Sequence, residues 1–254
     1  DAPVESFGGI MNLISTLFLN LPYPAKCAAA SLGGAYLDFL RYGPETEALV
    51  LEALARDTWD FDTWQLWQRP KLRALLIHAS EHVPYYRDYW AARKAAGDYA
   101  SREDLKNWPV LEKEDVRKNP EAFLSDNPRP RFVVWEHTSG TTGSPLKVAL
   151  SRKEVRFWYA LFEARWRRWY GVSRENRWAI IGGRQVAAPA AAKPPFWVWN
   201  ASFRQLYLSA SHLSPDSARS YLKALVSQKV DYIYAYSSAL YALALSGETQ
   251  NVLP

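Results

Sequence analysis

The sequence feature that most constrains the fold is the segment Thr138–Lys147, which reads TSGTTGSPLK and holds five hydroxyl side chains, two glycines and one lysine. The stretch before it, Arg131–Glu136, is rich in β-branched and aromatic residues and predicts a strand. After it, Ser151 and Glu154 form the S-x-x-E pattern that begins many helices. A glycine-rich loop between a strand and a helix predicts an α/β domain.

The composition of this loop suits the binding of phosphate groups. Glycines let successive backbone N–H groups approach an anion, hydroxyls add rotatable donors, and lysine adds a mobile positive charge. The loop is not the Walker type, because Pro145 and Leu146 stand where that pattern needs glycine and lysine. A flexible turn between two strands is the alternative interpretation.

Helical patterns fill residues 1–120. The leucines of Leu72–Ala79 recur at the spacing of one helix face, and this helix is expected to end before Pro84. Glu45–Arg56 and Glu112–Lys118 are two further expected helices.

Strands and helices alternate in the second half of the chain. Strands are expected at Trp178–Ile181 and Val230–Ala235, with helices beginning at Ser214-Pro215 and spanning Ser237–Leu245, where Gly247 is expected to end the helix. The predicted fold class is therefore α/β, with an N-terminal helical region over 1–120 and a partial, mostly parallel nucleotide-binding core over 121–254.

Charge and aromatic content raise nucleic-acid binding as a rival function. The formal charge is +5, but the excess is small and spread along the chain. Helical spacing is expected to place Trp158, Trp166 and Trp169 on a buried face, with the nearby arginines outside it. The sequence therefore favours core packing over stacking on bases, and we expect no nucleic-acid partner.

Few residues could bind a metal ion or anchor the chain. One cysteine, Cys27, excludes an internal disulfide, and His78 and His82 have helical zinc spacing without an obvious third ligand, so no metal site is predicted.

The apolar run Ile10–Leu19 is too short to span a bilayer, so at most weak membrane association and a cytoplasmic location are expected. Met11 is the expected natural start.

TSGTTGSPLK resembles the signature phosphate loop of the acyl-adenylate-forming superfamily. The commoner form there is TSGTTGxPKG, so Lys147 is displaced by one position and Val148 replaces a glycine. The SPLK variant resembles the phenylacetate–coenzyme A ligase branch, especially relatives described as capsular polysaccharide biosynthesis proteins. Further stretches resemble that branch over roughly residues 12–250: Leu72–Arg87, Trp108–Arg117, Gly182–Gln185, Gln205–Pro215 and Tyr234–Leu240.

The resemblance implies ATP-dependent activation of a carboxylate as an acyl-adenylate, followed by thioester formation with coenzyme A. It implies that the loop holds the β- and γ-phosphates through Thr138, Ser139, Gly140, Thr141, Thr142, Gly143 and Lys147. The aromatic–Gly–x–Thr–Glu run of the superfamily, which contacts Mg²⁺ and adenine, does not occur in these 254 residues. The chain is therefore expected to be an N-terminal part, with the C-terminal half of the adenylation domain missing, and to be inactive alone. A non-catalytic nucleotide-binding or assembly module is the alternative.

Four further residues are candidates for a pocket that binds a small-molecule acid. Arg184 follows a glycine pair at a predicted strand end, where ligands collect in α/β folds. Trp197 follows a proline pair, and by resemblance Tyr236 and Ser237 lie near the acyl site. A surface arginine, a core tryptophan and a helix cap are the competing interpretations. The acid itself is not readable, and a homodimer is one expected assembly.

Overall fold

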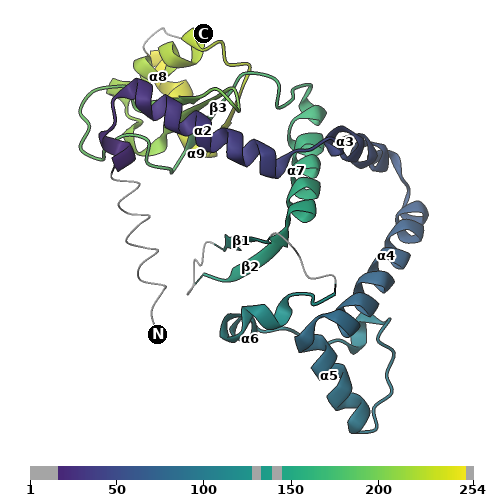
Figure 1. Ribbon diagram of the computed structural model, residues 1–254. Coiled ribbons are helices and arrows are strands. Elements are labelled where there is room, and N and C mark those ends of the chain that lie inside the picture. The colour runs from purple at the N-terminus through teal and green to yellow at the C-terminus, as the bar shows by residue number, and fades with distance from the viewer. Residues whose placement is uncertain (1–16, 128–132, 139–144, 250–254) are drawn as a thin grey trace. The chain divides into compact units, whose positions relative to one another are not determined.

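The computed structural model describes residues 17–127, 133–138 and 145–249 (Figure 1). The chain divides into two compact units, one formed by Asp1–Gly43 with Phe162–Pro254 and the other by Pro44–Leu161. Each unit is described by itself. Most of the predicted phosphate loop, Ser139–Ser144, lies outside the described residues, as do Met11 and most of Ile10–Leu19.

A four-stranded sheet organises the first unit, with strand order β4-β5-β3-β6. Its strands are β3 (Trp178–Gly182), β4 (Trp197–Asn200), β5 (Gln205–Ser209) and β6 (Tyr232–Ala235). The central strand β3 runs parallel to both β5 and β6, and β4 pairs antiparallel with β5. This arrangement confirms the predicted α/β fold with a mostly parallel sheet.

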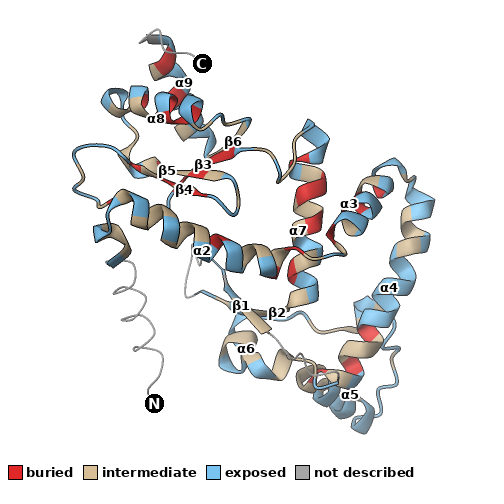
Figure 2. Cartoon of the chain, turned by 45° about the horizontal axis from the view of Figure 1, so that its top comes forward, coloured by how far each residue is buried: buried red, intermediate tan, exposed pale blue. Residues whose placement is uncertain are grey.

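Helices cover both faces of this sheet. Figure 2 shows α8 (Pro215–Ser227) and α9 (Ser237–Thr249) on one side and α2 (Tyr23–Arg41) on the other. Helix α8 begins as its sequence predicts, because the Ser214 side chain accepts from the Ser217 N–H and the Ser217 side chain binds back to Ser214. Helix α9 runs past Gly247 to Thr249, so the prediction that Gly247 ends this helix is wrong.

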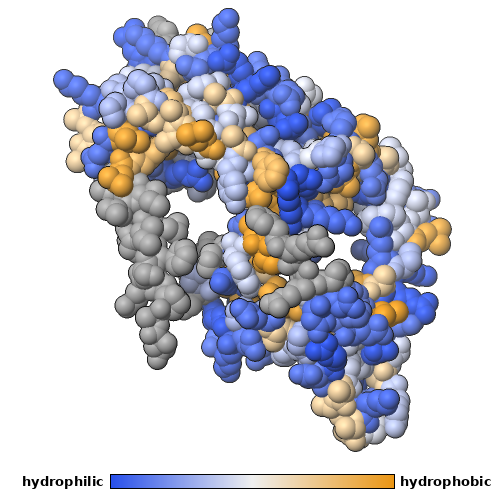
Figure 3. Space-filling view, viewed as in Figure 1, coloured by the Kyte–Doolittle hydropathy of each residue, from blue (hydrophilic) through white to orange (hydrophobic). Residues whose placement is uncertain are grey.

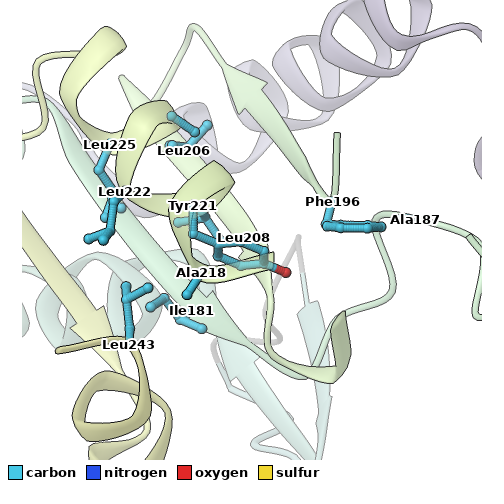
Figure 4. Close-up of a cluster of buried hydrophobic side chains, with 12 residues drawn as sticks. Ile181, Ala187, Phe196, Leu206, Leu208, Ala218, Tyr221, Leu222, Leu225 and Leu243 are labelled. Carbon is cyan, nitrogen blue, oxygen red and sulfur yellow. The ribbon is translucent and has the colours of Figure 1, made fainter. Parts of the chain in front are cut away.

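The hydrophobic core of the first unit lies between the sheet and helices α8 and α9 (Figure 4). The strands contribute Ile181, Leu206 and Leu208, and α8 contributes Tyr221, whose hydroxyl donates to the Ser209 carbonyl at 2.7 Å. Outside this core, α2 exposes apolar side chains, and Figure 3 shows hydrophobic patches over this helix.

The second unit is mainly helical, contains a β-hairpin and ends at Leu161, within the helix that follows the hairpin. Its elements are α3 (Thr46–Ala55), η1 (Arg56–Thr58), α4 (Phe61–His82), α5 (Pro84–Ala95), η2 (Leu105–Asn107), α6 (Lys113–Lys118), η3 (Pro120–Phe123), β1 (Val133–His137) and β2 (Lys147–Ser151). The predicted end of α4 before Pro84 is confirmed. Its leucine face is less buried than expected, because only Leu76 packs inside, while Leu72 and Leu75 are exposed.

Helix α7 (Arg152–Trp166) and the 3-10 turn η4 (Arg168–Tyr170) follow β2. The prediction that the tryptophans here are buried and the arginines outside is wrong: Trp158, Trp166 and Trp169 are more than half exposed, whereas Arg167 is 3% exposed. The physical reason is that Glu163, one turn before Arg167, neutralises its charge inside the protein. None of the helices in the described ranges has an apolar stretch of the length needed to cross a membrane.

Candidate functional site

The candidate phosphate loop is held between the two strands of the β1–β2 hairpin. The strands are antiparallel, and the last pair in register is His137 with Lys147. Beyond it, the Thr138 N–H donates to the Leu146 carbonyl and the Leu146 N–H donates to Thr138 Oγ1, both at 2.9 Å. These two hydrogen bonds join Thr138 and Leu146, the described residues at the two ends of the loop.

Lys147 is the first residue of β2 and projects its ammonium group over an aromatic ring. Its Nζ lies 4.3 Å from the centroid of the Trp135 ring on β1, within the range of a cation–π interaction. Lys147 is exposed, and the described residues provide it with no ion pair. The contact with Trp135 therefore holds a positive charge at the base of the loop without neutralising it.

A reciprocal cap fixes the start of helix α7 directly after the hairpin. The Glu154 N–H donates to Ser151 Oγ at 3.3 Å, and the Ser151 N–H donates to Glu154 Oε2 at 2.6 Å. This is the capping box that the S-x-x-E pattern predicts. Helix α7 thus follows strand β2 without an intervening segment.

The base of the loop carries groups that can bind an anion. Thr138 Oγ1 accepts one hydrogen bond and keeps its own proton for a further acceptor. Lys147 adds a cation beside it, and such groups suit an anionic ligand. Ser139, Gly140, Thr141, Thr142 and Gly143 belong to the part that is not described, so their roles stay predictions. In the described parts of the chain, no three His, Cys, Asp or Glu side chains gather to hold a metal ion.

The strand register places the predicted substrate-pocket residues at one edge of the four-stranded sheet. Gly182 of β3 pairs with Ser209 of β5, and Trp197 of β4 pairs with Leu208. Tyr236 and Ser237 follow β6 directly. This edge holds the carboxyl ends of the parallel strands, where ligands bind in open α/β sheets.

The side chains at this edge have different environments. Trp197 is half-buried, and its ring meets Tyr221 of α8 edge-on, with centroids 5.8 Å apart, as a core residue does. Arg184, Tyr236 and Ser237 are exposed. The exposed groups, and not the tryptophan, are therefore the ones that can meet a ligand at this edge.

Tyr207 is a residue at this edge that sequence reasoning did not select. It lies on β5, and its hydroxyl accepts from the Arg184 N–H at 2.9 Å. The Arg184 guanidinium lies over the Tyr207 ring, 5.6 Å from its centroid. The only available signal was its position in a stretch that resembles the ligase branch, Gln205–Pro215.

His212 near the same edge serves the structure. Its Nε2 lies 3.0 Å from the Ala188 carbonyl oxygen and must donate to it, so Nδ1 accepts from the Ser209 hydroxyl at 2.8 Å. Ser209 is buried, and the His212 ring stacks on Phe196. These contacts hold the loop after β5 and leave no ring nitrogen for a substrate.

A polar cavity of about 400 Å³ lies at the opposite edge of the sheet, near the starts of β3 and β5. Its charges pair with one another: Arg174 lies 3.4 Å from Asp38 and 3.3 Å from Glu175. Arg167, at its wall, donates to Glu163 and to the Tyr232 hydroxyl, and burial raises the pKa of Tyr232 to about 12 against the opposing charge of Arg167. We interpret this network as structural.

Comparison with known proteins gives partial relatives. The chain is 19% identical over 177 residues to protein CapK of Staphylococcus aureus, covering 70% of this chain and 39% of that protein. It is 32% identical over 103 residues to phenylacetate-coenzyme A ligase of Escherichia coli strain K12, covering 40% of this chain and 24% of that protein. A ligase of the same name from Thermus thermophilus is 28% identical over 118 residues.

These relatives confirm the similarity to the phenylacetate–coenzyme A ligase-like branch that the loop motif indicates. The chain spans less than two fifths of the length of the curated relatives it matches. No family model and no solved structure matches the chain.

Proposed function

We propose that the chain binds the β- and γ-phosphates of ATP with the Thr138–Lys147 loop, as part of an enzyme that activates a carboxylic acid. The observation that carries this proposal is the closed base of the loop, where Thr138 and Leu146 exchange two hydrogen bonds and Lys147 presents its charge. A loop of this composition, tied at its ends, concentrates N–H groups, hydroxyls and one ammonium group in a small volume.

The complete reaction is proposed for a protein of the length of the relatives. In that reaction the carboxylate of the substrate attacks the α-phosphorus of ATP, releases pyrophosphate and forms an acyl-adenylate. The thiol of coenzyme A then displaces AMP and gives the thioester. The loop contributes by holding the departing pyrophosphate in place and stabilising its charge, which is the main protein contribution in transfers of this kind. Mg²⁺ would shield the same phosphates.

Thermal melting in the presence of ATP and Mg²⁺ tests the binding proposal on this chain. A site of micromolar affinity at millimolar ATP adds about 4 kcal/mol to the free energy of unfolding. We expect a clear upward shift of the melting temperature, reduced in Lys147→Gln and retained in Lys229→Gln, whose lysine lies far along the chain in the other unit. No shift with the unchanged chain would reject the proposal.

An exchange assay separates binding from turnover. Incubation of the chain with ATP, labelled pyrophosphate and a panel of aromatic, fatty and sugar acids is expected to give no exchange. Acid-dependent return of label to ATP would show that the 254 residues suffice for the first half-reaction. The proposal that this chain binds ATP without activating the acid would then be wrong.

A further inference from the structure

Tyr207 touches the Gly182–Arg184 turn with both its polar and its aromatic parts. The hydroxyl accepts from the Arg184 N–H at 2.9 Å, and the face of the ring lies under the Arg184 guanidinium, 5.6 Å from the centroid. One side chain thus restrains both the backbone and the side chain of Arg184. Because these contacts come from the adjacent strand β5, the position of the turn depends on a residue distant in sequence.

Tyr207 occupies the space that a side chain at position 182 would need. A Cβ on Gly182 would lie 2.5 Å from the Tyr207 hydroxyl oxygen and 3.2 Å from Cζ of the same ring. Apart from Gly182 and its two chain neighbours, the next heavy atom is Cγ1 of Ile180, at 3.8 Å. Because Gly182 has no side chain, the hydroxyl of Tyr207 has room to reach the turn at the carboxyl end of β3.

The turn presents an uncompensated charge at the carboxyl edge of the sheet. Arg184 is exposed, and no carboxylate in the described ranges pairs with it. The hydroxyl of Tyr236 lies on the other side of the turn, 3.9 Å from where a Cβ of Gly183 would be. A guanidinium group fixed by a ring and a backbone hydrogen bond is suited to bind a planar carboxylate with two donors.

We propose that Tyr207 is a positioning residue that fixes Arg184 to bind the carboxylate of the acid substrate. The proposal rests on the function proposed above, because it assigns to this edge of the sheet the acid that ATP activates. It makes Arg184 the group that touches the substrate and Tyr207 the group that acts through it. Binding by Arg184 requires the carboxylate of the substrate and does not depend on the structure of the rest of the acid.

The first test measures the turn itself. In Tyr207→Phe the ring stays and the hydroxyl is lost, so we expect faster hydrogen exchange at the Arg184 amide by NMR, with the amides of the core strand β3 still protected. Unchanged exchange at Arg184 would overturn the positioning role, whatever the chain binds.

The second test measures binding of phenylacetate, with phenylacetamide as the uncharged probe of the same shape, in the presence of a non-hydrolysable ATP analogue. Arg184→Gln is expected to weaken phenylacetate binding about tenfold or more and to leave phenylacetamide unchanged. Tyr207→Phe should weaken it several-fold. Arg219→Gln, at an exposed arginine of α8 in the same unit, is the matched control and should have no effect.

A pair of substitutions tests whether the Tyr207 hydroxyl needs the space that Gly182 leaves open. Gly182→Ala should lower the melting temperature because its Cβ meets the Tyr207 hydroxyl, and adding Tyr207→Phe should recover part of that loss. The double variant should nevertheless bind phenylacetate as weakly as Tyr207→Phe alone. Recovery of binding together with stability would show that the hydroxyl only fills space, and the proposal would be wrong.

Failure of this inference is distinguishable from failure of the proposed function. If the chain binds ATP but neither Arg184→Gln nor Tyr207→Phe changes phenylacetate binding, or if it binds ATP and no phenylacetate, the inference is rejected and the phosphate loop stands. If the chain binds no ATP, the proposed function fails. The exchange rate at the Arg184 amide still decides whether Tyr207 fixes the turn.

Discussion

Glu163 and Arg167 form an ion pair inside the first unit, with Oε2 and Nη1 2.9 Å apart and the two side chains 2% and 4% exposed. The same carboxylate accepts from the Arg174 N–H at 3.0 Å, so it ties the end of α7 to the segment before β3. Arg167 also donates to Tyr232 of β6. A pair of this kind is costly to break, because either partner alone would be a buried charge.

Glu163→Gln is therefore expected to lower the free energy of unfolding by about 3–5 kcal/mol, since it removes the negative charge and leaves Arg167 buried. Urea denaturation followed by tryptophan fluorescence measures the change. Replacing both partners, as Glu163→Leu with Arg167→Met, should recover much of the loss. A loss below about 1 kcal/mol for the single variant, which is typical of an exposed pair, would contradict the burial described here.

Tyr232, whose hydroxyl accepts from Arg167, is expected to make the stability of the chain depend on pH above pH 10. Burial raises the pKa of Tyr232 from 10.0 to about 12 in the folded chain. Because the folded pKa is the higher one, the unfolded chain loses its proton first. The contribution of neutral, buried Tyr232 to the free energy of unfolding is therefore fully present below pH 10. It is lost as the pH rises through the pKa that Tyr232 has in the folded chain. Absorbance titration of tyrosinate should show a late-titrating group that is missing in Tyr232→Phe. If Tyr232→Phe instead removes a group that titrates near the ordinary value of 10.0, the raised pKa is excluded.

Two neighbouring glycines of α2 are expected to respond oppositely to the same change. A Cβ on Gly34 would lie 2.3 Å from Asn200 Oδ1, an atom that accepts from the Phe203 N–H, whereas a Cβ on Gly33 would meet nothing within 4 Å. Gly33→Ala should therefore stabilise the helix by up to about 1 kcal/mol. Gly34→Ala should destabilise the chain, because the buried Asn200 must move. Equal shifts in melting temperature for the two variants would argue against the packing of α2 on β4.

The cap of α7 gives a prediction close to the candidate phosphate loop. Ser151→Ala removes the oxygen that accepts from the Glu154 N–H, and such caps contribute about 1 kcal/mol. We expect a loss of that size in urea denaturation, with Ser246→Ala in α9 as a control for loss of a serine hydroxyl. If Ser151→Ala is as stable as the unchanged chain, the reciprocal cap does not form in solution.

Local signals in the sequence predicted the helix starts and the central strand of the sheet. Ser151 with Glu154, and Ser214 with Pro215, mark the starts of α7 and α8 because capping depends on residues close in sequence. The strand at Trp178 was predictable from its continuous apolar run, which is typical of a strand buried on both faces.

The β4–β5 hairpin was not predicted as strands, because its turn lacks the usual glycine or asparagine. The turn ends at Arg204, which adopts a φ of 49° without being glycine. The buried face of α7 was also mispredicted, since apolar spacing favoured the tryptophans and ignored the Glu163–Arg167 pair at i and i+4. For the candidate site, the sequence suggested the loop and Arg184, and their roles stay predictions; the contact of Tyr207 with Arg184 depends on strand register and could not be predicted.

Calorimetric titration of the chain with ATP, pyrophosphate and AMP tests the central claim most directly. If the Thr138–Lys147 loop holds the β- and γ-phosphates, ATP and pyrophosphate should bind and compete with each other, and AMP should not displace pyrophosphate. Thr138→Val, which removes the oxygen that closes the loop, should weaken both ligands, and Thr58→Val on η1 should weaken neither. Absence of pyrophosphate binding, or binding that Thr138→Val leaves unchanged, would contradict the assignment of this loop.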